Sequence, residues 1–219
     1  MLLKDRLNSI NQINDGRAQI LAVTKTFSIS QIEEGIAAGL THFGENRIQE
    51  AETKIPILRG KYPNLVWHLI GHLQSNKVKK AVQLFDSIDS VDSIGLAEEI
   101  DRKARETGKI IPVMIEVNIG GEEQKFGVSP EDVLIVVQEI VELKNLKLTG
   151  LMCVAPVVDD PEKVRGHFRR MREIFDEINR QITAVKLEYL SMGMSDDWKV
   201  AVEEGANMIR LGRALFGSR

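Results

Sequence analysis

QILAVTKTFS, residues 19–28, is an apolar run that stops at Lys25 and passes into a polar turn. Its aliphatic core, ILAV, is typical of a parallel strand that is buried on both faces. A helix signal follows directly, because Ser30 and Glu33 form a capping box and Gly39 lies where the helix must end. A buried strand followed at once by a helix is the unit from which parallel α/β folds are built.

The same alternation of short apolar runs and helix-period segments continues along the chain. It predicts strands at residues 19–25, 41–46, 67–73, 84–92, 113–118, 146–154, 186–193 and 207–212. Eight such units with right-handed crossovers close into a barrel, so the predicted fold class is α/β, a (β/α)8 TIM-type barrel. An extra amphipathic helix is predicted at residues 2–15. The alternative is an open doubly wound sheet, but its glycine-rich phosphate turn is absent, since VTKTFS follows the first strand.

Three further segments have the composition of helix starts. Residues 129–131 (Ser-Pro-Glu) and residues 160–161 (Asp-Pro) each place a capping side chain before a proline at the first helical position. Residues 195–197 (Ser-Asp-Asp) are expected to cap a helix that Gly205 ends, with two carboxylates near its positive end. These boundaries locate the loops between the predicted strands and helices.

Length and composition indicate a single globular domain over residues 1–219. Hydrophobic residues make up 43% of the chain and charged residues 28%, as in proteins with a buried core, and the length suits one core better than two. The net charge is −3 and the basic residues are dispersed. A nucleic-acid surface needs a concentrated basic face, so we expect no nucleic-acid partner.

The sequence also favours a location in the cytoplasm. The N-terminal residues mix charges into an amphipathic pattern and lack the apolar core of a signal peptide. No apolar run reaches the roughly 20 residues that cross a bilayer, so we expect no membrane contact. Cys153 is the single cysteine, which rules out an internal disulfide and fits a reducing compartment.

Polar residues gather at the carboxyl ends of the predicted strands, where a barrel places its binding or active site. Lys25 ends the first strand and Asn46 ends the second. Apolar walls at a barrel mouth disfavour the charged ammonium, and the neutral amine is the form that attacks a carbonyl. A lysine that merely extends into solvent is the ordinary alternative for any single lysine.

The seventh and eighth strand ends have the composition of an anion site. Ser191 and Gly193 lead into the capped helix, while Gly212 and Arg213 open a short terminal segment. Barrels commonly bind phosphate at these two loops, although turn glycines and serines alone would explain each loop. Arg210 lies within the apolar run MIRLG and needs a partner when buried. That partner is either a core carboxylate or a pyridine nitrogen.

A metal site and a nucleophilic cysteine are not indicated. His68 and His72 are four residues apart, but on a predicted strand and its exit, so they do not share a face as two helical ligands would. Cys153 has no identifiable partner and is expected to be a small buried hydrophobe.

Seven motifs occur in order along the chain: AVTKTFS, FGENRIQE, WHLIGHLQSNK, VNIGGEEQKFG, GLMCVAP, LSMGMSDDW and IRLGRALFG. Together they resemble the pyridoxal phosphate homeostasis family, from about residue 18 to the C-terminus, and such an ordered set is far more specific than any one motif. The resemblance implies a fold-type III barrel, similar to the N-terminal domain of alanine racemase, with pyridoxal 5′-phosphate as its cofactor.

The expected cofactor-binding residues are Lys25, Asn46, Ser191, Gly193, Arg210, Gly212 and Arg213. By the resemblance, Lys25 carries the cofactor as a Schiff base and Asn46 lies beside it. Ser191 and Gly212 hold the phosphate, and Arg210 faces the pyridine nitrogen. The two others are added as phosphate contacts because they lie in the same two loops.

Two classes of function fit these residues. The first is a non-catalytic carrier that buffers or delivers pyridoxal phosphate for vitamin B6 homeostasis, with apo-enzymes as possible recipients. The second is an amino-acid racemase-like enzyme, which needs an acid or base on each face of the substrate carbon. Racemase relatives draw one of these from a second domain, whereas this chain stops at Arg219, and only Tyr62 and Tyr189 could supply a phenol.

We therefore expect a carrier without turnover. A Schiff-base aldolase is a third option, in which the phosphate cup would bind a sugar phosphate directly. All the expected ligands come from the strand ends of one barrel, so we expect a monomer or a weak dimer.

Overall fold

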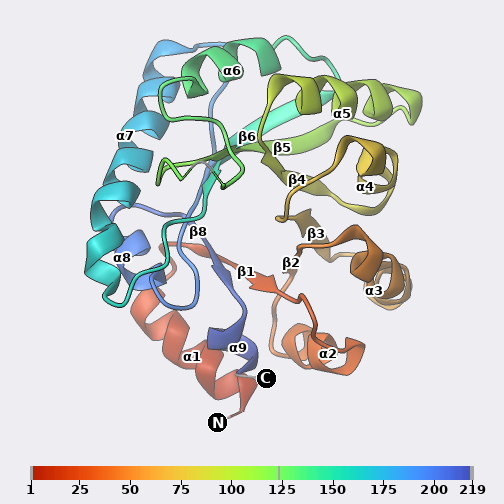
Figure 1. Cartoon of the computed structure of the whole chain (residues 1–219). Helices are drawn as coiled ribbons and strands as arrows, with labels where there is room; N and C mark the ends of the chain where they lie inside the picture. Colours follow the sequence, from red (N-terminus) through yellow and green to blue (C-terminus); the bar gives the residue numbers. More distant parts are fainter. Residues whose placement is uncertain (1, 123, 218–219) are drawn as a thin grey trace.

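A computed structural model describes residues 2–122 and 124–217, and its strands form a closed parallel barrel in the order β1 to β8 (Figure 1). The predicted (β/α)8 fold is confirmed. The strands are β1 (Gln19–Val23), β2 (His42–Glu45), β3 (Val66–Leu69), β4 (Ser87–Val91), β5 (Ile111–Val117), β6 (Leu146–Cys153), β7 (Tyr189–Ser191) and β8 (Met208–Leu211).

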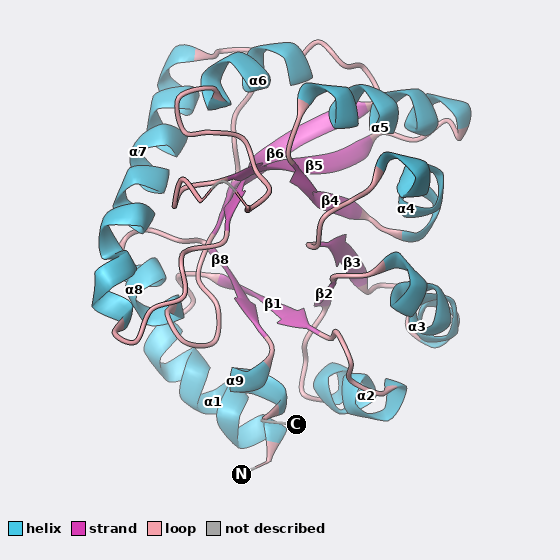
Figure 2. Cartoon of the chain, viewed as in Figure 1, coloured by secondary structure: helices cyan, strands magenta, loops and turns pink. Residues whose placement is uncertain are grey.

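The helices surround the strands as an outer ring (Figure 2). They are α1 (Leu3–Asn14), α2 (Ile29–Ala37), α3 (Ile48–Lys61), α4 (Val78–Leu84), α5 (Ile94–Glu106), α6 (Val133–Ile140), α7 (Arg165–Gln181), α8 (Trp198–Glu203) and α9 (Arg213–Phe216), with the 3-10 turns η1 (Ser75–Lys77) and η2 (Pro161–Val164). The predicted N-terminal helix is α1. It lies beside α8 and α9, so that both described ends of the chain meet on one side of the barrel (Figure 1).

Pairing of β1 with β8 closes the barrel. Four residue pairs lie in register along these strands, from Gln19 opposite Met208 to Ala22 opposite Leu211. The main apolar core lies between the strands and the outer helices, and a smaller cluster of Leu21, Met114, Met152 and Met208 is separate from it. Arg210 and Glu116 follow two of these residues at a spacing of two and share their inward face.

The structure corrects several predicted boundaries. The first strand ends at Val23, two residues before Lys25. The helix after it is capped by Ser28, whose hydroxyl accepts a hydrogen bond from the backbone N–H of Gln31, and the predicted capping residue Ser30 lies inside the helix. The serine and glutamine satisfy the same capping pattern two residues earlier. Asp160 caps its 3-10 turn as predicted.

No helix among the described residues is long and apolar enough to cross a membrane.

A hydrogen-bonded chain of side chains lies inside the amino-terminal end of the barrel. His42 Nδ1 is 3.1 Å from His68 Nε2, and His68 Nδ1 is 2.8 Å from Asp89 Oδ2. Asp89 Oδ1 also accepts a hydrogen bond of 2.5 Å from Ser87. His68 and Asp89 are buried, whereas His42 is partly exposed.

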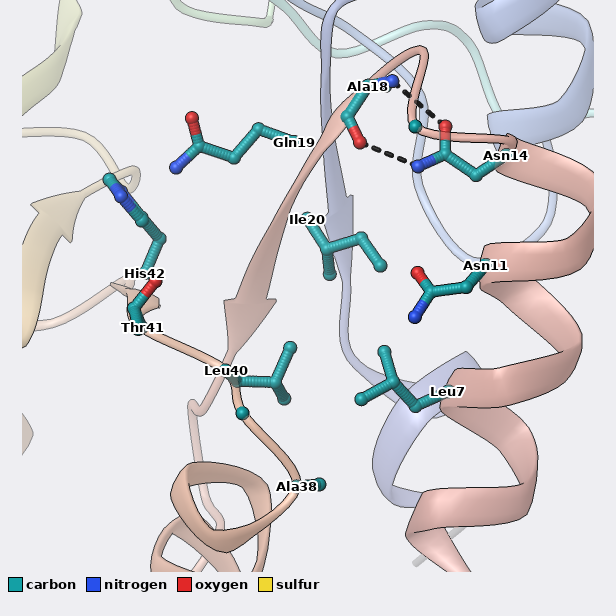
Figure 3. A pocket seen from close by; sticks show the side chains of 12 residues that line it. Leu7, Asn11, Asn14, Ala18, Gln19, Ile20, Ala38, Leu40, Thr41 and His42 are labelled. Atoms are coloured by element: carbon teal, nitrogen blue, oxygen red, sulfur yellow. Dashed lines mark hydrogen bonds between the residues drawn. The ribbon is translucent and has the colours of Figure 1, made fainter.

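His42, the outermost of these hydrogen-bonded side chains, faces a pocket of about 300 Å³ between α1 and the start of β1 (Figure 3). Gln19 and His42 lie on one side of β1, and Leu7 and Asn11 of α1 lie on the other. Asn14 fastens α1 to the strand, because its side-chain amide bonds both the N–H and the carbonyl of Ala18. This pocket is at the opposite end of the barrel from the predicted cofactor site.

Acid should destabilise the protein through His42. Burial, followed by the nearby His68, lowers the pKa of His42 from 6.5 to about 4, against the opposing influence of Asp89 and Asp86. The unfolded chain therefore takes up a proton before the folded chain does, and stability is lost as the pH falls from 6.5 toward 4. Urea unfolding across this range should show a shallower loss for His42→Gln than for the wild type. A His167→Gln control on α7 should behave as the wild type, and equal slopes in all three proteins would contradict the assignment.

Candidate cofactor site

A cavity of about 420 Å³ lies at the carboxyl ends of the strands, as the barrel fold predicts. Its lining combines one lysine, two arginines and several apolar side chains: Val23, Lys25, Phe27, Asn46, Ile70, Val154, Met194, Ser195, Asp196, Arg210, Gly212 and Arg213. A volume of this size, with mainly apolar walls and a few polar groups, is typical of a small-molecule site. Five of the seven expected site residues thus face one cavity.

Lys25 reaches the cavity from a tight turn beyond β1. The N–H of Phe27 donates to the carbonyl of Thr24 at 3.1 Å, which closes the turn with Lys25 and Thr26 in its middle. Lys25 is an exposed residue that lines the cavity, so the barrel walls do not bury it as the sequence suggested.

Asn46 presents a polar atom that the protein leaves without a partner. Its Oδ1 is buried and receives no hydrogen bond from the described residues. Gly71, beyond β3, packs directly against Asn46: a Cβ there would lie 2.2 Å from the Asn46 carbonyl oxygen. Buried polar atoms nearly always have a hydrogen-bond partner, so this oxygen is available to a donor that enters the cavity.

Arg210 is a buried cation held by oxygen atoms of the barrel. One terminal nitrogen donates to the Ser191 carbonyl at 2.8 Å and to the Ser191 hydroxyl at 2.9 Å, and the other donates to the Cys153 carbonyl at 2.6 Å. Burial lowers the pKa of Arg210. No described carboxylate forms an ion pair with it, so the ordinary alternative of a core ion pair is not found. The guanidinium is fixed by bonds to two neighbouring strands.

The loops after β7 and β8 are joined to each other at the cavity edge. The Ser195 hydroxyl accepts a hydrogen bond of 3.1 Å from the Ala214 N–H, and Asp196 pairs with Arg213 at 2.5 Å. The predicted cap at residues 195–197 is wrong in detail. Helix α8 begins at Trp198, and Asp197 accepts a hydrogen bond from the Met194 N–H inside the loop instead of capping the helix.

Ser191 and Gly193 do not line the cavity in the part of the chain that the structure describes. Ser191 is fully buried, and its hydroxyl serves Arg210. Gly193 has a φ of +91° and packs under α8, where a Cβ would lie 2.6 Å from the Cβ of Ala201. These positions explain both residues through support of the cavity, and their phosphate contacts stay a prediction.

Glu116 on β5 is not among the site residues predicted from the sequence. It lines a smaller pocket of about 200 Å³ with Asn118, Lys125 and Phe126, and this pocket shares Val154 with the main cavity. Burial raises the pKa of Glu116 to about 7, against the opposing charge of Arg210. Its signal in the sequence was a lone acidic residue within the apolar strand VMIEVN.

The structure also shows how the single cysteine and the potential metal ligands of the described residues are placed. Cys153 is free and buried, as expected for a small hydrophobic side chain, and burial raises its pKa to about 12. No group of three or more potential metal ligands occurs among residues 2–122 and 124–217.

The fold defines a class of barrel proteins that includes the alanine racemases. Residues 2–219 match the family described as the alanine racemase N-terminal domain. The alanine racemase of Clostridium difficile shares this fold, with a TM-score of 0.82 over 99% of this chain and 56% of the racemase, at 16% identity. At that identity, the likeness concerns the fold alone.

Closer relatives narrow the class. The pyridoxal phosphate homeostasis protein of Aquifex aeolicus is 44% identical over 92% of this chain and 87% of its own length, and that of Synechocystis is 40% identical over 92% and 91%. The structure of PipY from Synechococcus elongatus without PLP has a TM-score of 0.93 at 40% identity, covering 98% of this chain and all of PipY. The chain belongs to the pyridoxal phosphate homeostasis protein family.

The two glycines of the expected phosphate site should respond differently to substitution. Gly193→Ala should lower the free energy of unfolding by about 1–3 kcal/mol or more, because the new Cβ meets Ala201 and the backbone is left-handed. A Cβ at Gly212 lies no closer than 3.5 Å to the Val23 carbonyl oxygen, so Gly212→Ala should unfold nearly as the wild type does. Denaturant titration of the cofactor-free proteins measures both effects. Equal losses would show that packing does not distinguish these glycines.

Proposed function

We propose that this protein holds pyridoxal 5′-phosphate through a covalent link to Lys25 and buffers or delivers it within the cell, without turnover of a substrate. The observation that carries the proposal is the shared cavity of Lys25, Asn46, Arg210 and Gly212. One space of suitable size is thus surrounded by an amine, an unsatisfied hydrogen-bond acceptor, a fixed cation and a glycine whose backbone a ligand can approach closely.

Each part of the cavity fits a part of that molecule. The exposed Lys25 amine suits the aldehyde, and the unpartnered Asn46 oxygen suits a hydrogen-bond donor on the ring system. The apolar side chains of Ile70 and Val154 suit an aromatic ring. When bound, the cofactor supplies an aldehyde for reaction with amines and, in enzymes, an electron sink.

The phosphate is assigned to the joined loops after β7 and β8. Ser195, Gly212 and Arg213 line the cavity there. The Arg213 side chain pairs with Asp196 but is exposed, so it can turn from that carboxylate toward a bound anion. We add Ser195 to the expected ligands because its hydroxyl lies in the cavity wall. Ser191 contributes indirectly, through its two contacts with the Arg210 guanidinium.

The comparisons support this proposal. The relatives from Aquifex aeolicus and Synechocystis bear the name pyridoxal phosphate homeostasis protein. A second structure of PipY from Synechococcus elongatus, with PLP bound, has a TM-score of 0.90 and covers 98% of this chain. Both points favour a cofactor carrier in this family.

A racemase-like enzyme is the alternative, and two observations weigh against it. Arg210 carries a permanent charge, which disfavours a second proton on a facing pyridine nitrogen and so weakens the electron sink. Neither tyrosine lines the cavity: Tyr189 packs against the apolar cluster inside the barrel, and Tyr62 ends α3, with its hydroxyl 3.4 Å from Glu33. The described chain therefore places no phenol beside Lys25.

The wider setting follows from the same proposal. We propose one barrel domain over residues 1–219 that functions as a monomer, because the expected ligands all come from the strand ends and following loops of one barrel. The cytoplasm and apo-enzyme recipients remain the proposed location and partners, and no nucleic-acid or membrane partner is invoked.

Lys25→Ala should abolish the covalent chromophore and leave the fold intact, because the exposed side chain contributes little to the core. Absorbance spectra of protein incubated with the cofactor, followed by borohydride reduction and peptide mass mapping, measure this effect. Lys61→Ala, a second exposed lysine, is the matched control and should keep the chromophore. An adduct mapped to another lysine in the wild type would refute the assignment.

A carrier should transfer its cofactor and should not turn over amino acids. We expect the loaded protein to restore activity to an apo-enzyme that requires pyridoxal phosphate, and to racemise alanine no faster than buffer. Chiral chromatography of the amino acid and a coupled assay of the apo-enzyme provide the two measurements. Steady-state racemisation that disappears in Lys25→Ala would overturn the carrier proposal and favour the enzyme.

A further inference from the structure

The peptide groups on both sides of Lys25 are bonded to one ion pair of helix α3. Lys54 Nζ donates to the carbonyl of Thr24 at 2.8 Å, and that carbonyl belongs to the peptide group before Lys25. Glu50 accepts a hydrogen bond from the N–H of Thr26, which belongs to the peptide group after Lys25. Lys54 and Glu50 are themselves paired at 2.5 Å, one helical turn apart.

The Lys54 side of this contact is removed from solvent, whereas the Glu50 side chain is 22% exposed. Lys54 is only 7% exposed, and its amine also pairs at 3.0 Å with Glu45 of β2, which is fully buried. The Thr24 hydroxyl donates to the same Glu45 oxygen at 2.7 Å. Charge-assisted hydrogen bonds in such a low-dielectric setting are stronger than their exposed counterparts. The pairing therefore anchors the turn to both a helix and a strand.

The backbone of the turn requires an external hold. Thr26 has a φ of +65°, in the left-handed region that glycine adopts readily and a β-branched residue rarely does. It occupies the third position of a four-residue turn, where positive φ normally selects glycine or asparagine. The bond from its N–H to Glu50 offsets the cost of this conformation. Burial would raise the pKa of Glu50, but the hydrogen bonds from Lys54 and Thr26 outweigh it and lower that pKa, which favours the ionised acceptor.

We propose that the Glu50–Lys54 ion pair is a positioning device for the cofactor lysine, which fixes both peptide groups of Lys25 so that its amine enters the cavity in one orientation. The inference rests on the proposed attachment of the cofactor to Lys25. It assigns a function to α3, none of whose residues lines the cavity. Neither Glu50 nor Lys54 contacts the cofactor in this proposal; both act through the backbone.

Glu50→Ala is the most direct test, because it removes the contact with Thr26 and leaves Lys54 bonded to Glu45 and Thr24. In the cofactor-free protein, hydrogen exchange at the Thr26 amide, measured by NMR, should accelerate about tenfold, as expected for loss of one charge-assisted bond. In the loaded protein, the ratio of covalent to non-covalent cofactor, fixed by borohydride and measured by mass spectrometry, should fall by a similar factor. Glu50→Gln keeps an acceptor oxygen and should lie between the wild type and Glu50→Ala.

Lys61→Met is the matched control, since Lys61 lies on the same helix as Glu50 but forms its exposed ion pair with Glu33 of α2. It should change neither the Thr26 exchange rate nor the covalent ratio. An unchanged covalent ratio in a folded Glu50→Ala protein, or an unchanged Thr26 exchange rate, would overturn the proposal. If Glu50→Ala does not fold, the same two criteria apply to Glu50→Gln.

Failure of the underlying function is separately visible. It would appear as a wild-type protein that forms no adduct at Lys25, whatever the variants do, and it would remove the positioning role with it. A merely structural role for the ion pair predicts a lower melting temperature with an unchanged covalent ratio among the folded molecules, which also counts against the proposal.

Discussion

Pairing of β1 with β8 is the contact on which the site depends. It places the first strand of the chain beside the last, with Leu21 opposite Arg210 and Ala22 opposite Leu211. Continuation of that register brings Gly212 opposite Val23. A Cβ placed on Gly212 would lie 3.5 Å from the Val23 carbonyl oxygen. An amine at one end of the sequence and a cation at the other thus share one cavity. An open sheet would leave these two strands at opposite edges.

The interior of the barrel is organised around charge as well as apolar packing. Arg210 would be very costly to bury without partners, and the carbonyls of Ser191 and Cys153 supply them from β7 and β6. Asp89 and Glu116 share the interior with it at longer range, and both oppose the lowering of its pKa by burial. Cation and carboxylates therefore stabilise each other across the barrel. This arrangement keeps a positive charge at the floor of the cavity without a direct ion pair that would neutralise it.

The sequence predicted the barrel because apolar runs, such as ILAV in β1 and VMI in β5, alternate with helix-period segments along the chain. Strands β2 and β4 carry more polar residues and gave a weaker signal. It predicted strand ends poorly: polar residues such as Thr24 continue an extended pattern, and only the hydrogen bond from Phe27 back to Thr24 shows that the chain turns there. Motifs located Lys25, Asn46 and Arg210 at the cavity. They could not separate lining residues from supporting ones, because the Ser191 hydroxyl is bonded to Arg210, a residue 19 positions away.

The proposed reversible storage of pyridoxal 5′-phosphate on Lys25 places two opposed demands on that lysine. The amine must remain accessible, so that water or another amine can replace it, and yet it must return to the same orientation. The structure separates these demands: the Lys25 side chain is exposed, while the carbonyl before it and the N–H after it are bonded to the partly buried ion pair of Lys54 and Glu50. The backbone around Lys25 thus loses its conformational freedom during folding, and binding of the cofactor does not have to order it again. An accessible side chain on a fixed backbone suits exchange, whereas catalysis would also require a second group fixed opposite the amine.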